Sequence, residues 1–172
     1  ETKKVYPFDF ELQICYSLDE NKLNIDYKVI NKTETTMPFA IGAHPAFALS
    51  GHFEEYNLEF QQDESLKYHL LEEGLISNTT NEIQLDNKQL GLNYHLFEND
   101  ALVFKTLESK SITILKNETP ILKVNFTDFP NLGIWTVVNA PFLCIEPWFG
   151  YSDTLNEYDD FCKKEAIQLL GE

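Results

Sequence analysis

The chain has 172 residues, 43% of them hydrophobic and 24% charged, and its 13 lysines and 28 acidic residues give a net charge of −15 at pH 7. This length is typical of one domain, so we expect residues 1–172 to form a single domain, and no apolar run approaches the roughly 20 residues of a membrane span or resembles a signal peptide. The chain contains no arginine, and a negative surface without guanidinium groups argues against nucleic acid, membranes and phosphorylated ligands and favours a neutral partner.

Apolar and polar residues alternate along the first part of the chain, over 8–16 and again over 23–29. A period of two is typical of strands with one buried face. Turn-forming residues, Leu-Asp-Glu-Asn at 18–21, lie between the two runs. The three segments together predict a β-hairpin.

A second hairpin is predicted where the alternation returns, over 112–114 and 122–126, on either side of Asn-Glu-Thr-Pro at 117–120. One short helical turn is expected within 156–162. No segment keeps helical apolar spacing over three turns, so we predict an all-β fold of eight to eleven strands, a sandwich or a barrel. Further strands are expected at 53–60, 101–105, 133–138, 142–146 and 165–170.

Both ends of the sequence look abrupt. The alternation is already running at Phe8, and the last strand-like residues are followed only by Gly171 and Glu172. We therefore expect the chain to be part of a larger sandwich. A sandwich without its neighbouring strands leaves an unpaired edge and an uncovered apolar face, so self-association through that edge is a further expectation.

The three cysteines, Cys15, Cys144 and Cys162, are widely spaced and form no Cys-x-x-Cys pair. Neither a disulfide framework nor a zinc knuckle is indicated. We expect buried free thiols and a reducing, cytoplasmic location.

One break in the strand pattern is Ile-Gly-Ala-His-Pro-Ala-Phe at 41–47. His44 lies between small residues that allow close approach, and Pro45 restrains the backbone directly after it. A histidine in this setting is either a functional group or a core or turn histidine held by a backbone carbonyl, and the heptapeptide leaves both open.

The other break is Phe-Leu-Cys-Ile-Glu-Pro-Trp-Phe-Gly at 142–150. Alternation places Glu146 on the same face as Phe142 and Cys144, so its carboxylate is buried or lines a cleft. A buried ionised carboxylate costs several kcal/mol unless it is paired or hydrogen-bonded. Glu146 is therefore held by a lysine, by a histidine or by backbone N–H groups at a strand end, or it is a base with a raised pKa.

These segments together resemble a known family. Gly-Ala-His44-Pro-Ala-Phe and Cys-Ile-Glu146-Pro-Trp-Phe-Gly-Tyr-Ser-Asp are similar to the two signature segments of aldose 1-epimerases (galactose mutarotases), in particular of the LacX-like branch. Asn99-Asp100-Ala101-Leu102-Val103-Phe104 resembles that branch's substrate-contact segment. The resemblance covers nearly the whole chain, from Phe10 to about Leu170.

The resemblance implies a galactose mutarotase-like supersandwich with a sugar cleft and with no metal or cofactor. By analogy, Glu146 is the general base at the anomeric hydroxyl and His44 the general acid at the ring oxygen. Asp100 would hydrogen-bond a sugar hydroxyl. Trp148 and Phe47 would offer apolar surface to the ring, although a core role is equally open for each. We expect Glu146 and His44 to face each other across about one sugar ring, with Asp100 on the same wall.

The chain departs from the family pattern in one respect. Family members also use a second histidine and an arginine that precede the segment where this chain starts. His52, His69 and His95 all follow His44, so none takes the place of that histidine. We therefore expect the chain to be the carboxy-terminal portion of an epimerase-like domain whose activity in isolation is a separate question.

The sequence leaves four hypotheses about function. The first is an aldose 1-epimerase acting on a free hexose, with a monosaccharide as its partner. The second is a non-catalytic monosaccharide-binding sandwich. The third is a sugar-phosphate 1-epimerase, which the missing arginine and the net charge of −15 disfavour. A purely structural sandwich leaves Glu146 unexplained.

Overall fold

The computed structural model describes residues 2–156 and 158–171, and these are built mainly from antiparallel strands. The described residues also form four short 3-10 helices: η1 (Thr2–Lys4), η2 (Phe53–Glu55), η3 (Tyr94–Phe97) and η4 (Phe161–Lys163). The strands are β1 (Phe10–Asp19), β2 (Lys22–Asn31), β3 (Met37–Phe39), β4 (Ile41–Gly42), β5 (Ala46–Ala48), β6 (Tyr56–Phe60), β7 (Ser65–Glu72), β8 (Leu75–Gln84), β9 (Gln89–Gly91), β10 (Leu102–Phe104), β11 (Ser111–Lys116), β12 (Thr119–Asn125), β13 (Asn131–Trp135), β14 (Phe142–Phe149) and β15 (Gln168–Leu170).

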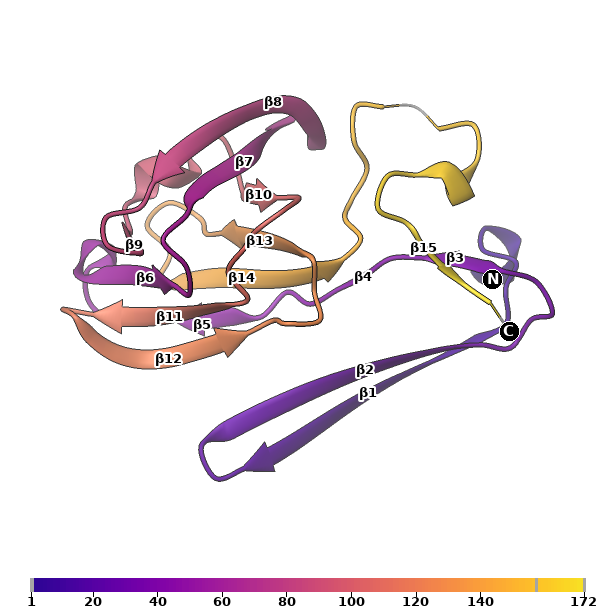
Figure 1. The fold of residues 1–172 in the computed structure, drawn as a ribbon, viewed down its shortest axis with the longest axis horizontal. Helices are drawn as coiled ribbons and strands as arrows, with labels where there is room; N and C mark the ends of the chain where they lie inside the picture. Colours follow the sequence, from indigo (N-terminus) through magenta and orange to yellow (C-terminus); the bar gives the residue numbers. More distant parts are fainter. Residues whose placement is uncertain (1, 157, 172) are drawn as a thin grey trace.

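Two sheets form a sandwich (Figure 1). The larger has the strand order β4-β14-β13-β10-β7-β8, with β5 also paired to β14, and the smaller has the order β12-β11-β6-β9. Alternate residues of both sheets point inward and make one apolar core, as expected for strands buried on one face. This main core includes Leu58 and Phe60 of β6, Ile112 and Ile114 of β11, Phe104 of β10, Ile134 of β13, and Leu143 and Ile145 of β14. The predicted all-β sandwich is confirmed.

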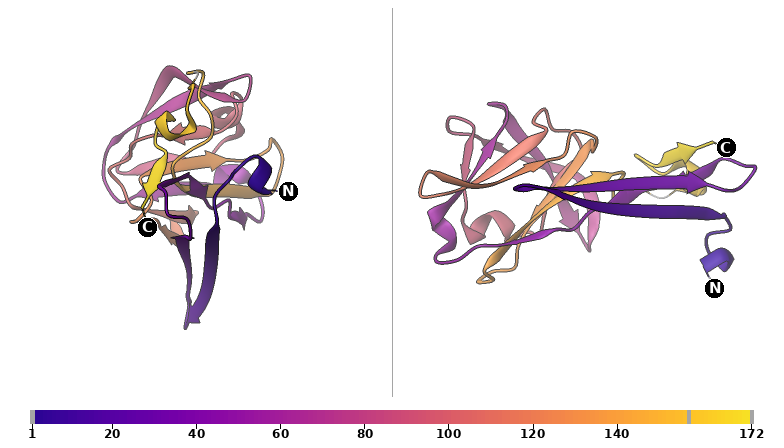
Figure 2. Two further views of the ribbon diagram at one scale, coloured as in Figure 1. Left: turned by 90° about the vertical axis from the view of Figure 1, so that its right-hand side faces the viewer. Right: turned by 90° about the horizontal axis from the view of Figure 1, so that it is seen from below.

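The first predicted hairpin is confirmed, and it stands apart from the sandwich. Among the described residues, strands β1 and β2 pair only with each other, and Figure 1 shows them as a separate arm that runs below the sandwich from the end where the chain termini lie (the left view of Figure 2 shows the same arm from that end). One face carries apolar cross-strand pairs, among them Leu12 with Val29 and Ile14 with Tyr27. Among the described residues, one contact between aromatic rings joins the hairpin to the sandwich. The centroid of the Tyr27 ring lies 5.9 Å from that of Phe129.

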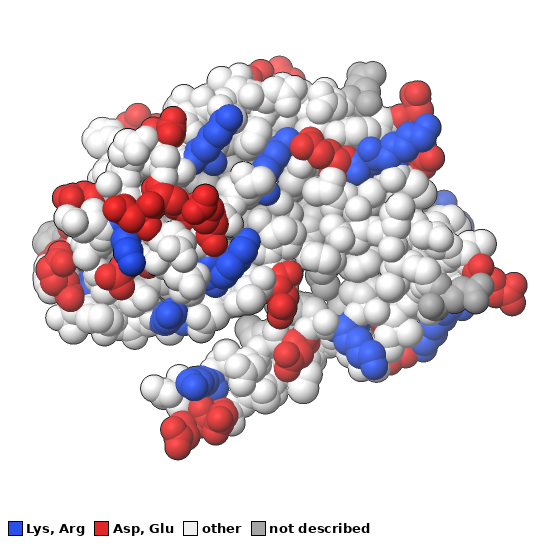
Figure 3. Space-filling view, viewed as in Figure 1, with Lys and Arg blue, Asp and Glu red and all other residues white. Residues whose placement is uncertain are grey.

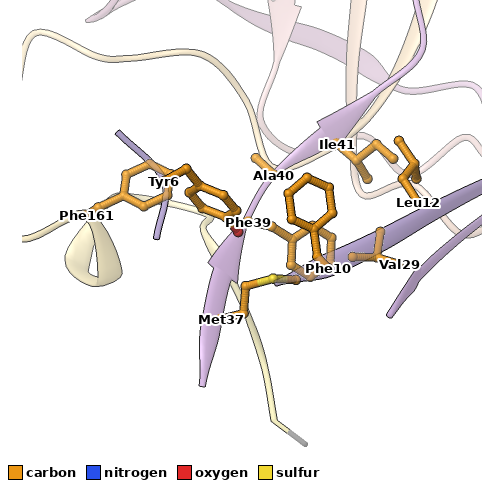
Figure 4. Close-up of a pocket in the computed structure, with 9 residues that line it drawn as sticks. All are labelled: Tyr6, Phe10, Leu12, Val29, Met37, Phe39, Ala40, Ile41 and Phe161. Atoms are coloured by element: carbon orange, nitrogen blue, oxygen red, sulfur yellow. The ribbon is translucent and has the colours of Figure 1, made fainter. Parts of the chain in front are cut away.

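An apolar cavity of about 230 Å³ lies at the base of the hairpin (Figure 4). Uncharged surface extends over this region in Figure 3, while carboxylates gather over the sandwich. Strand β3, which pairs with β15, forms one side of the cavity. The lining residues are Tyr6, Phe10, Leu12, Val29, Met37, Phe39, Ala40, Ile41 and Phe161.

The second predicted hairpin, β11–β12, is confirmed with a shifted turn. Asn117 and Glu118 both have positive φ, 46° and 62°, which is the conformation of a tight two-residue hairpin loop. Pro120, predicted to lie in the turn, falls within β12 opposite Leu115, beside an irregularity in the register. A proline is tolerated there because β12 is an edge strand.

The sequence missed several strands. It predicted eight to eleven, and the described residues contain fifteen, because β3, β4, β5 and β9 have only two or three residues each. Strand β8, Leu75–Gln84, is polar along most of its length and lies at the edge of the large sheet, so it has no alternating pattern to read. The predicted turn within 156–162 is the 3-10 helix η4, and residue 157 lies outside the described residues.

The expectation of buried thiols is correct for only one cysteine. Cys144 is buried. Cys15 is exposed in β1, on the face of the hairpin opposite its apolar pairs, and Cys162 is exposed in η4. All three are free. Among the described residues, no helix has both the length and the apolar character needed to cross a membrane.

Candidate active site

The candidate site lies on the face of the large sheet that points away from the main core. In β14, Leu143 and Ile145 enter the core, so the alternating neighbours Cys144, Glu146 and Trp148 point to the opposite face. The register pairs Glu146 with Gly133 of β13. The sequence prediction that residues 144 and 146 share a face is in accord with this register.

His44 reaches Glu146 from the segment between β4 and β5. The Ala43 N–H donates to the Pro147 carbonyl at 2.9 Å, which fixes this segment along β14. The Nδ1 atom of His44 then lies 2.9 Å from Oε2 of Glu146. The imidazole is 64% exposed and the carboxylate 6% exposed, so the pair opens to solvent on the histidine side. Among the alternatives for Glu146, the structure therefore selects a histidine partner.

Burial raises the pKa of Glu146, and this is the largest influence on it. The nearby charge of His44 and a hydrogen bond from the Trp148 side chain lower the pKa, while the negative charge of Asp100 raises it again. The balance is a pKa above the ordinary value of 4.5. Glu146 is thus a buried carboxylate with increased basicity, within an apolar strand.

Trp148 lies flat across its neighbouring strands, beside Glu146. A Cβ atom added to Gly42 would come within 2.5 Å of Cδ1 of the indole, and one added to Gly133 within 2.5 Å of Cζ2. These two glycines therefore leave the space that the indole occupies over β4 and β13. The side chain belongs to a small second cluster with Ile76, Val103 and Tyr151.

Asp100 and Phe47 have different placements. Asp100 is exposed just before β10, with φ of 74°, and its Oδ1 accepts the Ala101 N–H at 2.8 Å. Its charge reaches Glu146, as the pKa influence above indicates. Phe47 pairs with Leu143 and packs against the main core, so the structure does not bring it to the face that carries Glu146.

Sequence reasoning did not single out Cys144 and Trp135, which complete the surroundings of His44. The register pairs these two residues across β14 and β13. The Trp135 ring meets the imidazole edge to face at 6.0 Å between centroids. One donor atom from each of His44, Cys144 and Glu146 lies within 4.8 Å of the other two, so the three could hold a metal ion. A signal was present for Cys144, in its two-residue spacing from Glu146.

Lys105 is a cation on the same sheet face, two residues after Val103. Its Nζ lies 2.9 Å from both carboxylate oxygens of Glu165 and 5.1 Å from the Tyr151 ring centroid. Lys105 and the Tyr151 hydroxyl lower the pKa of Glu165 against the effect of burial. The charge of Lys105 is therefore already engaged within the protein.

The expected separation of Glu146 and His44 by about one sugar ring is wrong, because the two side chains are in direct contact at 2.9 Å. The expectation treated the two groups as opposite walls of a cleft. In the fold they are next to each other on one wall, since the His44 segment runs antiparallel alongside β14.

Comparisons with known proteins found similar sequences and similar folds. A sequence model of the family described as aldose 1-epimerase matches residues 1–161. Two curated relatives from Lactococcus lactis subsp. lactis, the plasmid and chromosomal forms of protein LacX, are each 40% identical over 162 residues. The alignment covers 88% of this chain and 54% of each relative, so the chain spans about half of their length.

Solved structures match the fold over 99% of this chain. A galactose mutarotase related enzyme from Lactobacillus acidophilus has a TM-score of 0.87 and 28% identity, with 59% of its own chain covered. A galactose mutarotase-like protein from Lactobacillus casei has a TM-score of 0.87 and 26% identity, with 61% covered. The whole fold of this chain therefore has a counterpart within these larger proteins.

Proposed function

Because the chain belongs to the aldose 1-epimerase family, we propose that it carries the proton-transferring pair of a mutarotase, an isomerase that interconverts the α and β anomers of a free aldohexose. The observation that carries this proposal is the buried Glu146 carboxylate, 2.9 Å from the exposed imidazole of His44. A base and an acid side by side are what an acid–base isomerisation requires.

The proposed reaction moves two protons. The Glu146 carboxylate takes the proton of the C1 hydroxyl while the His44 imidazolium gives a proton to the ring oxygen. The bond between C1 and the ring oxygen breaks as the electron pair released from the O–H bond forms the aldehyde C=O. After rotation about C1–C2, the ring closes on the other face of the aldehyde and the two groups exchange roles.

The close contact of Glu146 and His44 suits this chemistry. The hydroxyl that loses a proton and the ring oxygen that gains one are bonded to the same carbon, C1. Acid and base must therefore act at adjacent atoms, and a pair on one wall reaches both. The raised pKa of Glu146 also supports the proposal, because a stronger carboxylate base is better matched to a hydroxyl proton.

Two further residues have proposed roles in holding the sugar. Trp148 is partly exposed and spans the strands beside Glu146, so its indole can lie against the C–H face of a pyranose. The exposed carboxylate of Asp100 can accept a hydrogen bond from a sugar hydroxyl. Phe47 is not proposed as a sugar contact, because it packs against the main core.

Polarimetry tests the proposal. Freshly dissolved α-D-glucose and α-D-galactose are followed with the 172-residue chain and with a longer protein that contains it. The 54% coverage of LacX supports such a longer protein, and we propose that this chain is its carboxy-terminal portion. We expect faster mutarotation than the spontaneous rate with the longer protein. No acceleration by either protein at any concentration would overturn the proposal.

A non-catalytic sugar-binding sandwich is the second candidate, favoured by the absence of arginine from this chain. Calorimetry and polarimetry on one sample separate the two functions. Saturable binding of a monosaccharide with an unchanged rate of mutarotation would support the binding module. The exposed thiols of Cys15 and Cys162 fit a reducing, cytoplasmic location for either function.

A free sugar is expected to be preferred over its phosphate. The net charge of −15 repels a phosphoryl group, and Lys105, a cation on the same sheet face, is paired with Glu165 at 2.9 Å. We expect kcat/KM for glucose to exceed that for glucose 6-phosphate by at least about tenfold, which corresponds to about 1.4 kcal/mol. The measurement is a comparison of both anomerisations by NMR exchange. Faster turnover of the phosphate would contradict this expectation.

The 172-residue chain is expected to self-associate through the apolar face of the β1–β2 hairpin. Ile14, Tyr16 and Leu18 on this face are 46%, 65% and 76% exposed. A second copy presents the same face and the same unpaired strand edges, so a symmetric dimer covers both at once.

Matched substitutions test the dimer by sedimentation equilibrium. Replacing Ile14 and Tyr16 with lysine is expected to raise the dissociation constant by at least about tenfold, because each buried apolar side chain contributes about 1.5–3 kcal/mol. Replacing Gln13 and Ser17, which lie on the other face of the hairpin, with lysine adds the same charge. These replacements are expected to change the dissociation constant little. A monomer at all concentrations would contradict the expectation.

A further inference from the structure

Cys144 is a buried residue of the candidate site that the proposed reaction does not use. It is 1% exposed. Its side chain lies on the same sheet face as that of Glu146, because the two residues are two positions apart in β14. Burial, and after it the charge of Glu146, raise the pKa of the Cys144 thiol to about 11. The thiol is therefore protonated at neutral pH and does not act as a free nucleophile.

The three side chains around this position make a mixed donor set. One atom each from His44, Cys144 and Glu146, a nitrogen, a sulfur and an oxygen, lie within 4.8 Å of one another. Zinc binds these donors at about 2.0–2.3 Å, which places tetrahedral ligands about 3.3–3.8 Å apart. The imidazole and carboxylate meet at 2.9 Å and the sulfur lies within 4.8 Å of both, so binding requires this pair to open and the sulfur to lie at ligand distance from each.

Charge and access also suit a divalent cation of intermediate softness. With the thiol proton released to solvent, thiolate and carboxylate together carry two negative charges, which balance Zn²⁺. Cys144 and Glu146 are buried, whereas the His44 imidazole is 64% exposed, so an ion enters from the histidine side and keeps a fourth position open to water. The described residues contain one other histidine–carboxylate contact, His95 with Glu98. Both of these side chains are exposed, and they do not belong to a group of potential metal ligands that includes a cysteine.

We propose that His44, Cys144 and Glu146 bind one Zn²⁺ ion through nitrogen, sulfur and oxygen. The consequence for activity rests on the proposed function: a bound ion takes a carboxylate oxygen of Glu146 and, in place of a proton, a ring nitrogen of His44. Neither group then exchanges that proton with the sugar, so zinc is a reversible inhibitor. A chelator removes the ion and restores the proton-transferring pair. Cys144 then makes the site sensitive to thiophilic metals without taking part in proton transfer.

The binding test needs no sugar and no activity. The 172-residue chain is prepared with Cys15 and Cys162 replaced by serine, so that Cys144 is the remaining thiol. Co²⁺ is added as a spectroscopic probe, and Zn²⁺ is titrated by calorimetry. We expect one ion per chain, a thiolate-to-cobalt charge-transfer band, and release of about one proton from the thiol.

Two variants and one control locate the site. Cys144→Ser is expected to abolish the charge-transfer band, and His44→Ala to weaken zinc binding at least about tenfold. His44 is the second variant because its exposed side chain is replaced without disturbing the core. His95→Ala removes the other histidine–carboxylate pair and is expected to leave zinc binding within a factor of about two.

The outcomes separate this proposal from the proposed function. No cobalt band, or zinc binding that survives both Cys144→Ser and His44→Ala, would overturn the metal site whatever the sugar assays give. If the longer protein has mutarotase activity, zinc is expected to inhibit its Cys144→Ser variant less than the wild type. The ratio of the mutarotation rates with and without zinc is then closer to one in the variant. Zinc binding without any mutarotase activity would retain the metal site and remove only the inhibitory role.

Discussion

Replacing Glu146 by glutamine is expected to lower the rate of anomer interconversion in the longer protein by about 10²–10⁴-fold, the usual contribution of a general base. Glutamine keeps the volume and can still hydrogen-bond His44, but it cannot accept the C1 hydroxyl proton. Sugar binding is expected to persist. Polarimetry gives the rate and calorimetry the affinity.

The same variant is expected to be at least as stable as the wild type at neutral pH. Burial raises the pKa of Glu146, so the folded chain favours the protonated form. The favourable contribution is complete below the unfolded value near 4.5 and is lost as the pH rises through the higher folded value. The melting temperature of the wild type relative to that of Glu146→Gln is therefore expected to fall as the pH rises from about 4.5 through this window.

Glu98→Gln is the matched control, since Glu98 also contacts a histidine but is 60% exposed. It is expected to leave the rate of anomer interconversion unchanged. A Glu146→Gln protein with wild-type mutarotation would remove Glu146 from the proposed mechanism. A variant that is markedly less stable at pH 7 would instead make the ionised pair with His44 a stabilising contact.

Gly133→Ala is expected to destabilise the chain by about 1–3 kcal/mol, because the new Cβ would meet the Trp148 indole at 2.5 Å. A rigid indole above a strand cannot rotate away as a flexible side chain can. At roughly 2–4 °C per kcal/mol for a chain of this size, the melting temperature should fall by about 2–12 °C. Thermal unfolding followed by circular dichroism gives this shift.

Gly91→Ala on β9 is the control for Gly133→Ala. Its Cβ would meet only the flexible Asn57 side chain, at 3.3 Å, so we expect a change within about 0.5 kcal/mol. Gly42→Ala is expected to behave like Gly133→Ala, because its Cβ would also come within 2.5 Å of the indole. Equal stability of the Gly133 and Gly91 variants would show that Trp148 moves without cost.

Much of the fold could be read from local patterns. The β1–β2 hairpin follows from strict alternation around a two-residue turn, and both are properties of adjacent residues. The apolar strand around Glu146 follows in the same way. Strand β8 could not be read, because an edge strand of largely exposed side chains has no hydrophobic period. For Phe47 the sequence left a sugar contact and a core role open, and the pairing decides for the core, because Phe47 lies opposite the core residue Leu143.

The sequence by itself determined the all-β class, the two hairpins, and the two segments that carry His44 and Glu146. Local periodicity and motif spacing are enough for these features, because they depend on neighbouring residues. Only the tertiary structure decided that the two side chains touch and that the Cys144 sulfur joins them. Those facts depend on the pairing of distant segments alongside β14, and sequence separation does not encode the register of that pairing.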